Sequence, residues 1–322
     1  MQRNQTIDFL RGLCMFYIVG VFHLTQYLGE QYYLNNNVYG HSLMWSCLGT
    51  FSLISGYLLG MKYECNNFRD VLFFYKKRII RFYPLFILSA ILLLLIGFND
   101  LSQTAYALTG LAPFVSHAPK TLWYISMIMI FYLISPIVLT SRVKRVIFSI
   151  AILLFFCLLS RIIRVDLRFL YNLMLYLFGI CVASVRFDQW KGHRYIKWVG
   201  IVLTLLVYSY LLCNLSTKNS LLFSMATNVF GVFALVSLAS LLMKVLPNDS
   251  RVISFMSFTS MSCYLFHRFT YWLCLQLFNP KDLLSKSLYL VLVAFPVGLV
   301  FSYYIQKLYD VIVINIQKKN NE

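Results

Sequence analysis

Residues 8–23 read DFLRGLCMFYIVGVFH, and this segment decides how the rest of the chain is interpreted. It belongs to an apolar run that is long enough to cross a membrane, yet it carries Asp8, Arg11 and His23. Ionisable groups in hydrocarbon are costly, so they usually face a polar interior and serve a function. Alternatively, Asp8 and Arg11 lie among the lipid headgroups, His23 lies near the opposite interface, and water solvates all three.

The composition of the 322 residues excludes a soluble globular fold. Hydrophobic residues make up 60% of the chain and charged residues only 12%, whereas soluble domains are about 25% charged. The eight cysteines show no CxxC and no metal-ligand spacing, which predicts buried thiols and no metal site. No small-residue cleavage site follows the first apolar run, so we expect a retained span, not a removed signal peptide.

About ten apolar runs approach the roughly 20 residues that a transmembrane helix needs. They cover residues 9–28, 43–62, 82–98, 121–140, 145–160, 168–185, 195–213, 221–246, 252–278 and 287–309. The fifth run is short, and the ninth is long enough to be tilted or broken. Short polar loops separate the runs. The sequence therefore predicts an all-α polytopic membrane protein in which residues 1–322 form one transmembrane domain.

The basic residues give these spans an orientation. An even number of spans places both termini on one side, and a cytoplasmic placement gathers about nineteen Lys and Arg residues inside against about seven outside. This distribution absorbs most of the net charge of +17 and leaves nucleic-acid binding without support. Arg161, Arg164 and Arg168 run against the rule. Either the fifth and sixth spans form a re-entrant pair, or these arginines meet an anionic partner outside.

The spacing within residues 8–23 predicts a helical irregularity. Asp8 and Arg11 are three residues apart, so they share a helix face and can pair. His23 follows Arg11 by twelve residues, which is about 18 Å along a straight helix and about 120° around it. A joint Arg11–His23 site therefore needs a π-bulge, which tends to occur at functional sites, and Gly20 marks a place for it. Without it, the two side chains would act at different depths of one cavity.

A basic segment, KKRIIRFYP at residues 76–84, leads into the third span. Arg78 and Arg81 are three residues apart and so point in one direction at the predicted cytoplasmic end. Positive-inside anchoring explains them simply. Alternatively they clamp phosphate groups, because arginine offers bidentate donors to phosphate oxygens.

Three further segments carry candidate residues. In FSLISGY at residues 51–57, the Ser-Gly step most simply allows close helix packing, and alternatively it exposes backbone donors to a ligand. Trp123 and Tyr124 at the predicted outer boundary are typical of an aromatic belt. His267 and Arg268 lie inside the ninth span, where anchoring explains them poorly, so we expect them to face a cavity.

Taken in this order, the segments resemble the motifs of the acyltransferase-3 family of integral membrane acyltransferases. Ile7–Gly12 followed by His23 looks like the opening motif, and residues 51–59 look like the FxxSGYLL segment. Residues 78–84 are similar to the RxxRxxP turn. Residues 122–136 are similar to the Trp-containing span, and residues 264–267 to the YLxH motif. The resemblance covers residues from about 5 to 310, and five motifs in the correct order make it fairly specific.

Two departures from the family pattern matter. The family usually has ten residues between the arginine and the histidine, whereas this chain has eleven. Many members carry a Glu pair in the Trp segment, where this chain has Ile128 and Met129. The second departure resembles the small, single-domain O-acetyltransferase branch. The first affects the paired geometry of Arg11 and His23.

The resemblance implies transfer of an acyl group, typically acetyl from cytoplasmic acetyl-CoA, to a hydroxyl of a surface or lipid-linked glycan in a bacterial inner membrane. His23 would be the general base or a transient nucleophile, and Arg11, held by Asp8, would orient the thioester or stabilise its oxyanion. The residues expected to bind the donor are Lys77, Arg78, Arg81, Ser55 and Gly56. Those expected at the acceptor are Trp123, Tyr124, His267 and Arg268.

Two other classes of function remain open. A transporter or flippase for a lipid-linked glycan or a small anion would use Arg11, His23 and His267 to line its pathway, but gives no reason for the RxxR turn. A structural subunit of a glycan export machine explains none of the intramembrane charges. Binding of labelled acetyl-CoA discriminates between the enzyme and the transporter.

Overall fold

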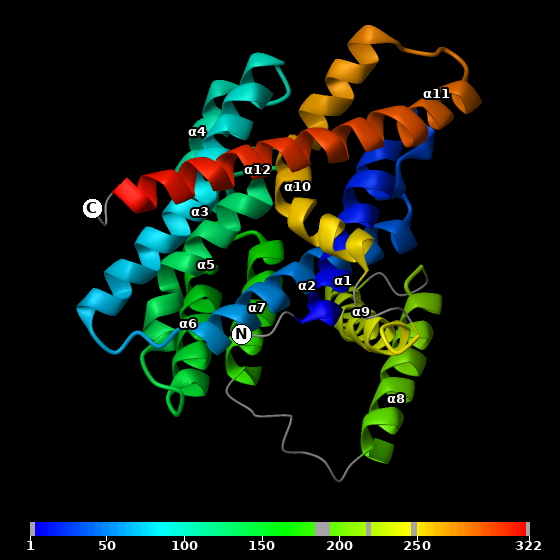
Figure 1. Cartoon of the computed structure of the whole chain (residues 1–322). Coiled ribbons are helices and arrows are strands. Elements are labelled where there is room, and N and C mark those ends of the chain that lie inside the picture. The colour runs from blue at the N-terminus through cyan, green and yellow to red at the C-terminus, as the bar shows by residue number, and fades with distance from the viewer. Residues whose placement is uncertain (1–3, 184–193, 217–219, 246–249, 320–322) are drawn as a thin grey trace.

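The computed structural model describes residues 4–183, 194–216, 220–245 and 250–319, and these are called the described residues below. Within them the regular secondary structure is helical, without strands (Figure 1). The longer helices are α1 (Gln5–Met15), η1 (Phe16–His23), α2 (Val38–Lys62), α3 (Phe68–Leu95), α4 (Leu101–Thr109), α5 (Trp123–Leu139), α6 (Arg145–Leu159), α7 (Leu167–Val182), α8 (Arg194–Cys213), α9 (Leu221–Leu242), α10 (Arg251–Leu277), α11 (Leu283–Tyr289), η6 (Leu290–Ala294) and α12 (Phe295–Lys319).

Several of these helices can cross a membrane. Within the described residues, five segments are long and apolar enough: Gln5–His23, Val38–Lys62, Phe68–Leu95, Leu221–Leu242 and Leu283–Asn315. Four shorter apolar helices accompany them, at residues 123–139, 145–159, 167–182 and 198–213. The chain is therefore an all-α, multi-pass membrane protein. The number of ten spans and the cytoplasmic termini stay predictions. Arg3, Arg186, Lys191 and Lys218, which were counted for the orientation, lie outside the described residues, as do the ends of the predicted spans 168–185 and 221–246.

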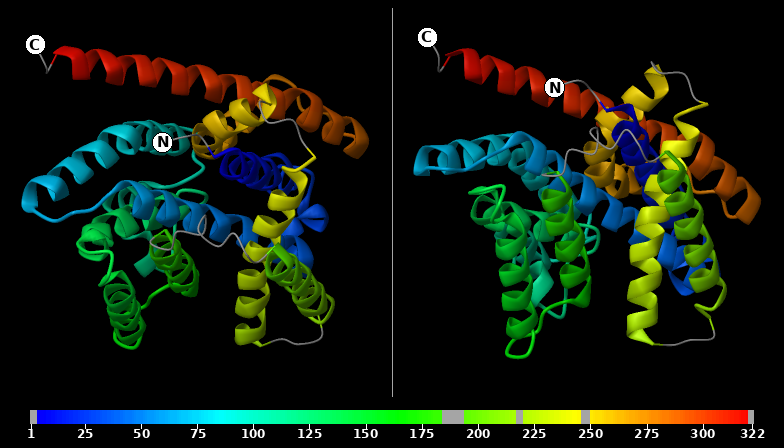
Figure 2. Two further views of the ribbon diagram at one scale, coloured as in Figure 1. Left: turned by 60° about the horizontal axis from the view of Figure 1, so that its bottom comes forward. Right: turned by 90° about the horizontal axis from the view of Figure 1, so that it is seen from below.

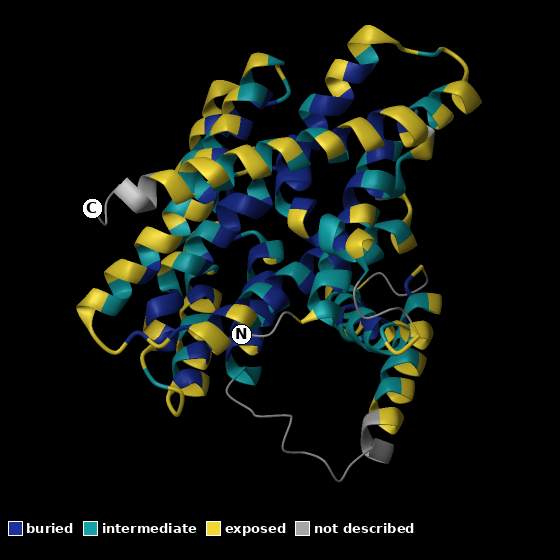
Figure 3. Cartoon of the chain, viewed as in Figure 1, coloured by how far each residue is buried: buried dark blue, intermediate teal, exposed yellow. Residues whose placement is uncertain are grey.

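The surface fits a lipid environment. Large apolar side chains are exposed on the outward faces of α6, α8 and α12, whereas the buried residues gather where α1, α2 and α10 meet (Figure 3). The paired helices α8 and α9 stand to one side of the group formed by α5, α6 and α7 (Figure 2). This arrangement leaves the contact of α1, α2, α3, α5 and α10 as the interior of the molecule.

The structure moves one predicted helix boundary and shows that another predicted span is unbroken. The third helix begins at Phe68 and not at residue 82, because the Asn67 side chain accepts from the Asp70 amide and Asp70 reciprocates in a capping box. The basic segment is therefore helical, and Arg78 and Arg81 project from α3. The ninth predicted span, which could have been broken, is the continuous helix α10.

A short helix, α4, was not predicted. Asp100 caps it by accepting from the Gln103 amide at 2.7 Å, and Gly110 ends it with a φ of +81°. The hydrogen bonds from Gln103 and Ser102 lower the pKa of the Asp100 carboxyl. Because α4 packs beside α5, it helps to hold the segment that leads into α5.

The helices α2 and α7 cross at glycines. An ideal Cβ atom on Gly56 would lie 1.9 Å from the carbonyl oxygen of Tyr176, and one on Gly179 would lie 2.3 Å from that of Leu53. Only glycine allows the two backbones to approach so closely. The packing interpretation of the Ser55-Gly56 step is confirmed for Gly56. This residue faces α7, and its contact with a donor stays a prediction.

The end of α2 is held by a buried cation. Arg145, which was expected at the cytoplasmic surface, is completely buried at the start of α6. Its guanidinium donates to the carbonyl oxygens of Gly60 at 2.9 Å and Tyr63 at 3.1 Å, in the last turn of α2. A cation there also stabilises the negative end of the helix dipole. This contact fixes the end of α2 beside the basic cavity that is described next.

Candidate active site

Polar contacts join α1 and η1 to α10, and three of those between described residues involve the ionisable residues of the opening segment. All three link the ionisable residues of the opening segment with side chains more than 240 residues later. They are Ser257 Oγ donating to Asp8 Oδ1 at 2.5 Å, Arg11 Nη2 donating to Ser260 Oγ at 3.1 Å, and His23 Nδ1 lying 2.8 Å from His267 Nε2. The structure therefore excludes the interpretation in which water solvates Asp8, Arg11 and His23 separately.

The predicted irregularity near Gly20 is confirmed. Residues Phe16–His23 form a π-helix, so the irregular segment is longer than the single-residue bulge that was expected. The ring of Phe295 lies where a side chain on residue 20 would be, 3.0 Å from an ideal Cβ, and a second π-helix, η6, directly precedes it. Because Ser260 and His267 are two turns apart on one face of α10, Arg11 and His23 face the same side of that helix.

The hydrogen bonds of the histidine pair determine its tautomers. His267 Nδ1 lies 2.8 Å from the carbonyl oxygen of Tyr264, and a carbonyl can only accept, so Nδ1 carries the hydrogen. In the neutral pair, His267 Nε2 is then the acceptor for Nδ1–H of His23. This leaves Nε2 of His23 with a free lone pair. Since His267 is fully buried while His23 is partly exposed, His23 is the member that a substrate can reach.

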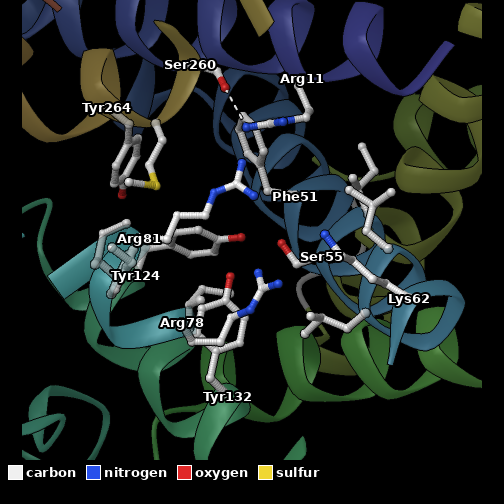
Figure 4. A pocket seen from close by; sticks show the side chains of 17 residues that line it. Arg11, Phe51, Ser55, Lys62, Arg78, Arg81, Tyr124, Tyr132, Ser260 and Tyr264 are labelled. Atoms are coloured by element: carbon white, nitrogen blue, oxygen red, sulfur yellow. Dashed lines mark hydrogen bonds between the residues drawn. The ribbon is translucent and has the colours of Figure 1, made fainter. Parts of the chain in front are cut away.

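A cavity of about 350 Å³ lies beside these contacts, and three arginines reach into it (Figure 4). Arg11 comes from α1, and Arg78 and Arg81 come from α3. Ser55 of α2 lines the same cavity, so the structure brings together four residues that were predicted from separate motifs. Its other lining residues include Phe51, Lys62, Phe82, Tyr124, Ile128, Tyr132, Ser260 and Tyr264.

A wider space of about 920 Å³ continues from this cavity and shares Arg11, Lys62, Arg78 and Arg81 with it. Lys77, which was predicted to bind the donor, lines this outer part. The acidic side chains there are Asp8 and Asp310. The two spaces together form a basic entrance that narrows into a more apolar chamber. Among the described residues, no group of three potential metal ligands occurs.

Arg78 is poised for a further ligand. Its Nη2 donates to the Tyr63 hydroxyl at 2.9 Å, and its guanidinium lies over the rings of Tyr63, Phe74 and Tyr132. Its Nε is buried and has no hydrogen-bond partner. A buried donor without a partner costs about 1–3 kcal/mol, which an anionic ligand would recover. Arg78 is thus a partly buried residue with an unpaired donor, and not a freely solvated surface anchor.

Tyr264 stands between the cavity and the histidines. It lines the inner end of the cavity with Tyr124, and its ring centroid is 6.4 Å from that of His23 and 6.0 Å from that of His267. Its hydroxyl donates to the carbonyl oxygen of Thr121 at 2.9 Å. The cavity therefore ends one aromatic ring away from His23.

The model of the acyltransferase-3 family, described as an acyltransferase domain, matches residues 4–307. The chain belongs to the acyltransferase-3 family. The searches of curated proteins and of solved structures found no match. Membership agrees with the motif order, and it assigns the chain to membrane acyltransferases without naming a donor or an acceptor.

Several predicted roles change in this acyltransferase. Tyr124 does not lie in an outer aromatic belt: it is buried, donates to the carbonyl oxygen of Leu48 at 3.0 Å, and lines the basic cavity. Trp123 lies apart from that cavity, under the guanidinium of Arg168 at 4.7 Å. Arg168 also pairs with Asp166, so an intramolecular partner offsets one of the three outer arginines.

The positions of His267 and Arg11 also differ from the prediction. His267 was expected at the acceptor; in the structure it is buried and contacts His23. Arg11 contacts Ser260, which is seven residues and about 10 Å along α10 from His267. Arg11 therefore belongs to the basic cavity more than to the histidine pair. The matching i, i+3 spacing of Ser257 and Ser260 is the signal by which the partners of Asp8 and Arg11 could have been found.

Proposed function

We propose that this acyltransferase moves an acyl group, with acetyl as the simplest case, from cytoplasmic acyl-CoA to a hydroxyl of a cell-surface or lipid-linked glycan. The observation that carries the proposal is a pair of contacting histidines placed one aromatic ring beyond a cavity that three arginines line. The enzyme would reside in a bacterial inner membrane with both termini in the cytoplasm. Family membership and a cavity that ends at Tyr264 favour the enzyme over a transporter.

The two connected spaces suit a CoA thioester. Arg78, Arg81, Lys62 and Lys77 would bind the phosphates at the wide entrance, because guanidinium and ammonium groups make strong, charge-assisted hydrogen bonds to phosphate. The chamber beyond them is lined by Phe51, Ile128 and Tyr132 and would take the pantetheine arm. Its volume lies within the range of about 300–1,000 Å³ that is typical of ligand pockets.

The histidine pair supplies the base. The free lone pair on His23 Nε2 takes the proton of the acceptor hydroxyl while the hydroxyl oxygen attacks the thioester carbonyl. The C–S bond then breaks, an O–C ester bond forms, and the CoA thiolate leaves and takes the proton from His23. His267 keeps Nδ1 of His23 protonated and so presents Nε2 to the substrate. Side-chain displacement of Tyr264 would open the route between donor and base.

The donor site is tested by binding of labelled acetyl-CoA to the purified protein. Arg78→Gln and Arg81→Gln are each expected to raise Kd about tenfold to a hundredfold, because each removes a charge-assisted hydrogen bond to phosphate. Arg142→Gln is the matched control, since Arg142 is an exposed arginine that pairs with Glu64 away from the cavity. Wild-type protein that fails to bind acetyl-CoA, or equal losses in all three variants, would contradict the proposal.

The role of His267 is tested by two substitutions. His267→Leu removes the acceptor for His23 Nδ1–H, so the pair loses its fixed tautomer, and kcat is expected to fall about a hundredfold with KM for acetyl-CoA unchanged. His267→Gln keeps an acceptor oxygen and is expected to restore part of kcat. The measurement is kcat against pH for both variants. A purely structural His267 would instead give the two variants equal activity, in proportion to the folded fraction.

A further inference from the structure

A second group of cations lies next to the histidine pair, on α10 and in the segment before α5. Along α10, Ser260 lies beside Arg11, and His267 and Arg268 follow about two turns later. Arg268 is only 5% exposed, and no carboxylate among the described residues pairs with it. Its guanidinium donates to two neutral groups, Thr121 Oγ1 through Nε and Gln26 Oε1 through Nη2. A buried charge without a counter-ion is expensive and needs an explanation.

Lys120 brings a second positive charge to the same place. The guanidinium of Arg268 lies 5.2 Å from the ring centroid of Phe98, and the ammonium of Lys120 lies 5.5 Å from that same centroid. Lys120 is exposed and has no ion pair with any described residue. The arrangement contrasts with that of Arg168, whose charge Asp166 balances. Two cations thus share one aromatic ring, and neither forms an ion pair with a described residue.

An unsatisfied hydroxyl completes the group. The ring of Tyr27 lies 5.6 Å from the guanidinium of Arg268, and its hydroxyl is buried without a hydrogen-bond partner. Leaving such a group unpaired costs about 1–3 kcal/mol. The group therefore offers positive charge and a free hydroxyl, and it lacks the acceptor that would satisfy them.

The backbone that carries Lys120 is held in a strained conformation. Thr121 has a φ of +66°, and Leu122 donates to the carbonyl oxygen of Lys120 at 2.7 Å, so residues 120–122 form a tight γ-turn. Asn99 Oδ1 accepts from the Lys120 amide at 3.0 Å, and α10 binds Thr121 at both its carbonyl and its hydroxyl. Non-glycine residues keep such angles only where the surroundings enforce them, as at ligand sites.

We propose that Arg268, Lys120 and Tyr27 bind the anionic group of the acceptor, so that the acceptor is a sugar carrying a carboxylate or a phosphate near the hydroxyl that is acylated. Arg268 directly follows His267, and His267 contacts His23, so an anion at Arg268 holds its sugar next to the base. Arginine suits this task because its planar donors match the two oxygens of a carboxylate or phosphate. The inference rests on the proposed function for the identity of the reaction.

The test compares three soluble acceptors with purified full-length protein and labelled acetyl-CoA: methyl glucoside, methyl glucuronide and glucose 1-phosphate. At least one anionic acceptor is expected to show a KM about tenfold or more below that of methyl glucoside, as one charge-assisted hydrogen bond provides. Lys120→Ala is expected to raise KM for that anionic acceptor about tenfold more than KM for methyl glucoside. Lys281→Ala, which removes another exposed lysine, is the matched control.

The outcomes separate the two proposals. A preference for the glucuronide identifies a carboxylate ligand, and a preference for glucose 1-phosphate identifies a phosphate. Equal KM values for the three acceptors, or an equal effect of Lys120→Ala on all of them, overturn the anionic site. If no acceptor is acylated, the proposed function fails, and calorimetric binding of the two anionic sugars to wild type and Lys120→Ala still decides the inference. Arg268→Lys, which keeps the charge but not the planar fork, should weaken that binding too.

Discussion

Replacing His23 with glutamine is expected to lower kcat for acyl transfer by about a hundredfold to ten-thousandfold, the usual contribution of a general base. Glutamine can still donate to His267 Nε2, so the contact between η1 and α10 is kept while the basic lone pair is lost. KM for acetyl-CoA should change little, because His23 is not among the residues that line the donor cavity. The measurement is the steady-state rate of labelled acetyl transfer at varied donor concentration.

His117→Gln provides the matched control, since His117 is exposed in the segment between α4 and α5. Its kcat should equal that of the wild type. Transfer at the wild-type rate by the His23 variant would remove His23 from the chemistry. An acyl group trapped on the wild-type enzyme and absent from the His23 variant would instead identify His23 as a nucleophile.

The largest effect on stability is expected at Gly56. Alanine there places a Cβ atom 1.9 Å from the carbonyl oxygen of Tyr176, and a backbone atom cannot turn aside as the end of a side chain can. Because α2 and α7 must separate, Gly56→Ala should lower the free energy of unfolding by about 3 kcal/mol or more, at the upper end of overpacking effects. Thermal unfolding of the detergent-solubilised protein measures the change.

Gly200→Ala tests whether the effect comes from the close approach or from the loss of a helical glycine. No atom lies within 4 Å of an ideal Cβ on Gly200 in α8, so alanine should stabilise the helix by up to about 1 kcal/mol. Opposite shifts of Tm for the two variants are therefore expected. A Gly56→Ala protein as stable as the wild type would mean that α2 and α7 are further apart than described.

The membrane class and much of the site could be predicted from the sequence, because the relevant signals are local. Apolar run length predicts spans directly, and the spacing of Arg11 and His23 required an irregular helix that the structure shows as η1. Arg78 and Arg81 are three residues apart and therefore share a helix face. For this reason both line one cavity once α3 packs against the interior of the molecule.

The remaining features depend on how distant helices face one another, which local patterns do not contain. Tyr124 and Trp123 are neighbours in sequence, yet Tyr124 lines the basic cavity and Trp123 lies under Arg168. Gly56 and Ser55 are neighbours too, yet they face α7 and the cavity respectively. Which residue of each pair turns inward is set by the crossing of two helices. The contact of His23 with His267 required the same knowledge of α1 and α10.

The contacts between α1 and α10 also have a consequence for biosynthesis. Arg11 leaves the ribosome 249 residues before its partner Ser260. At about 5–20 residues per second, synthesis of this interval takes on the order of ten to fifty seconds. During that time Asp8, Arg11 and His23 lack their α10 partners, so an incomplete chain that ends before α10 cannot form the histidine pair. The polar groups of the first helix to be synthesised thus stay without these contacts until one of the last helices is made.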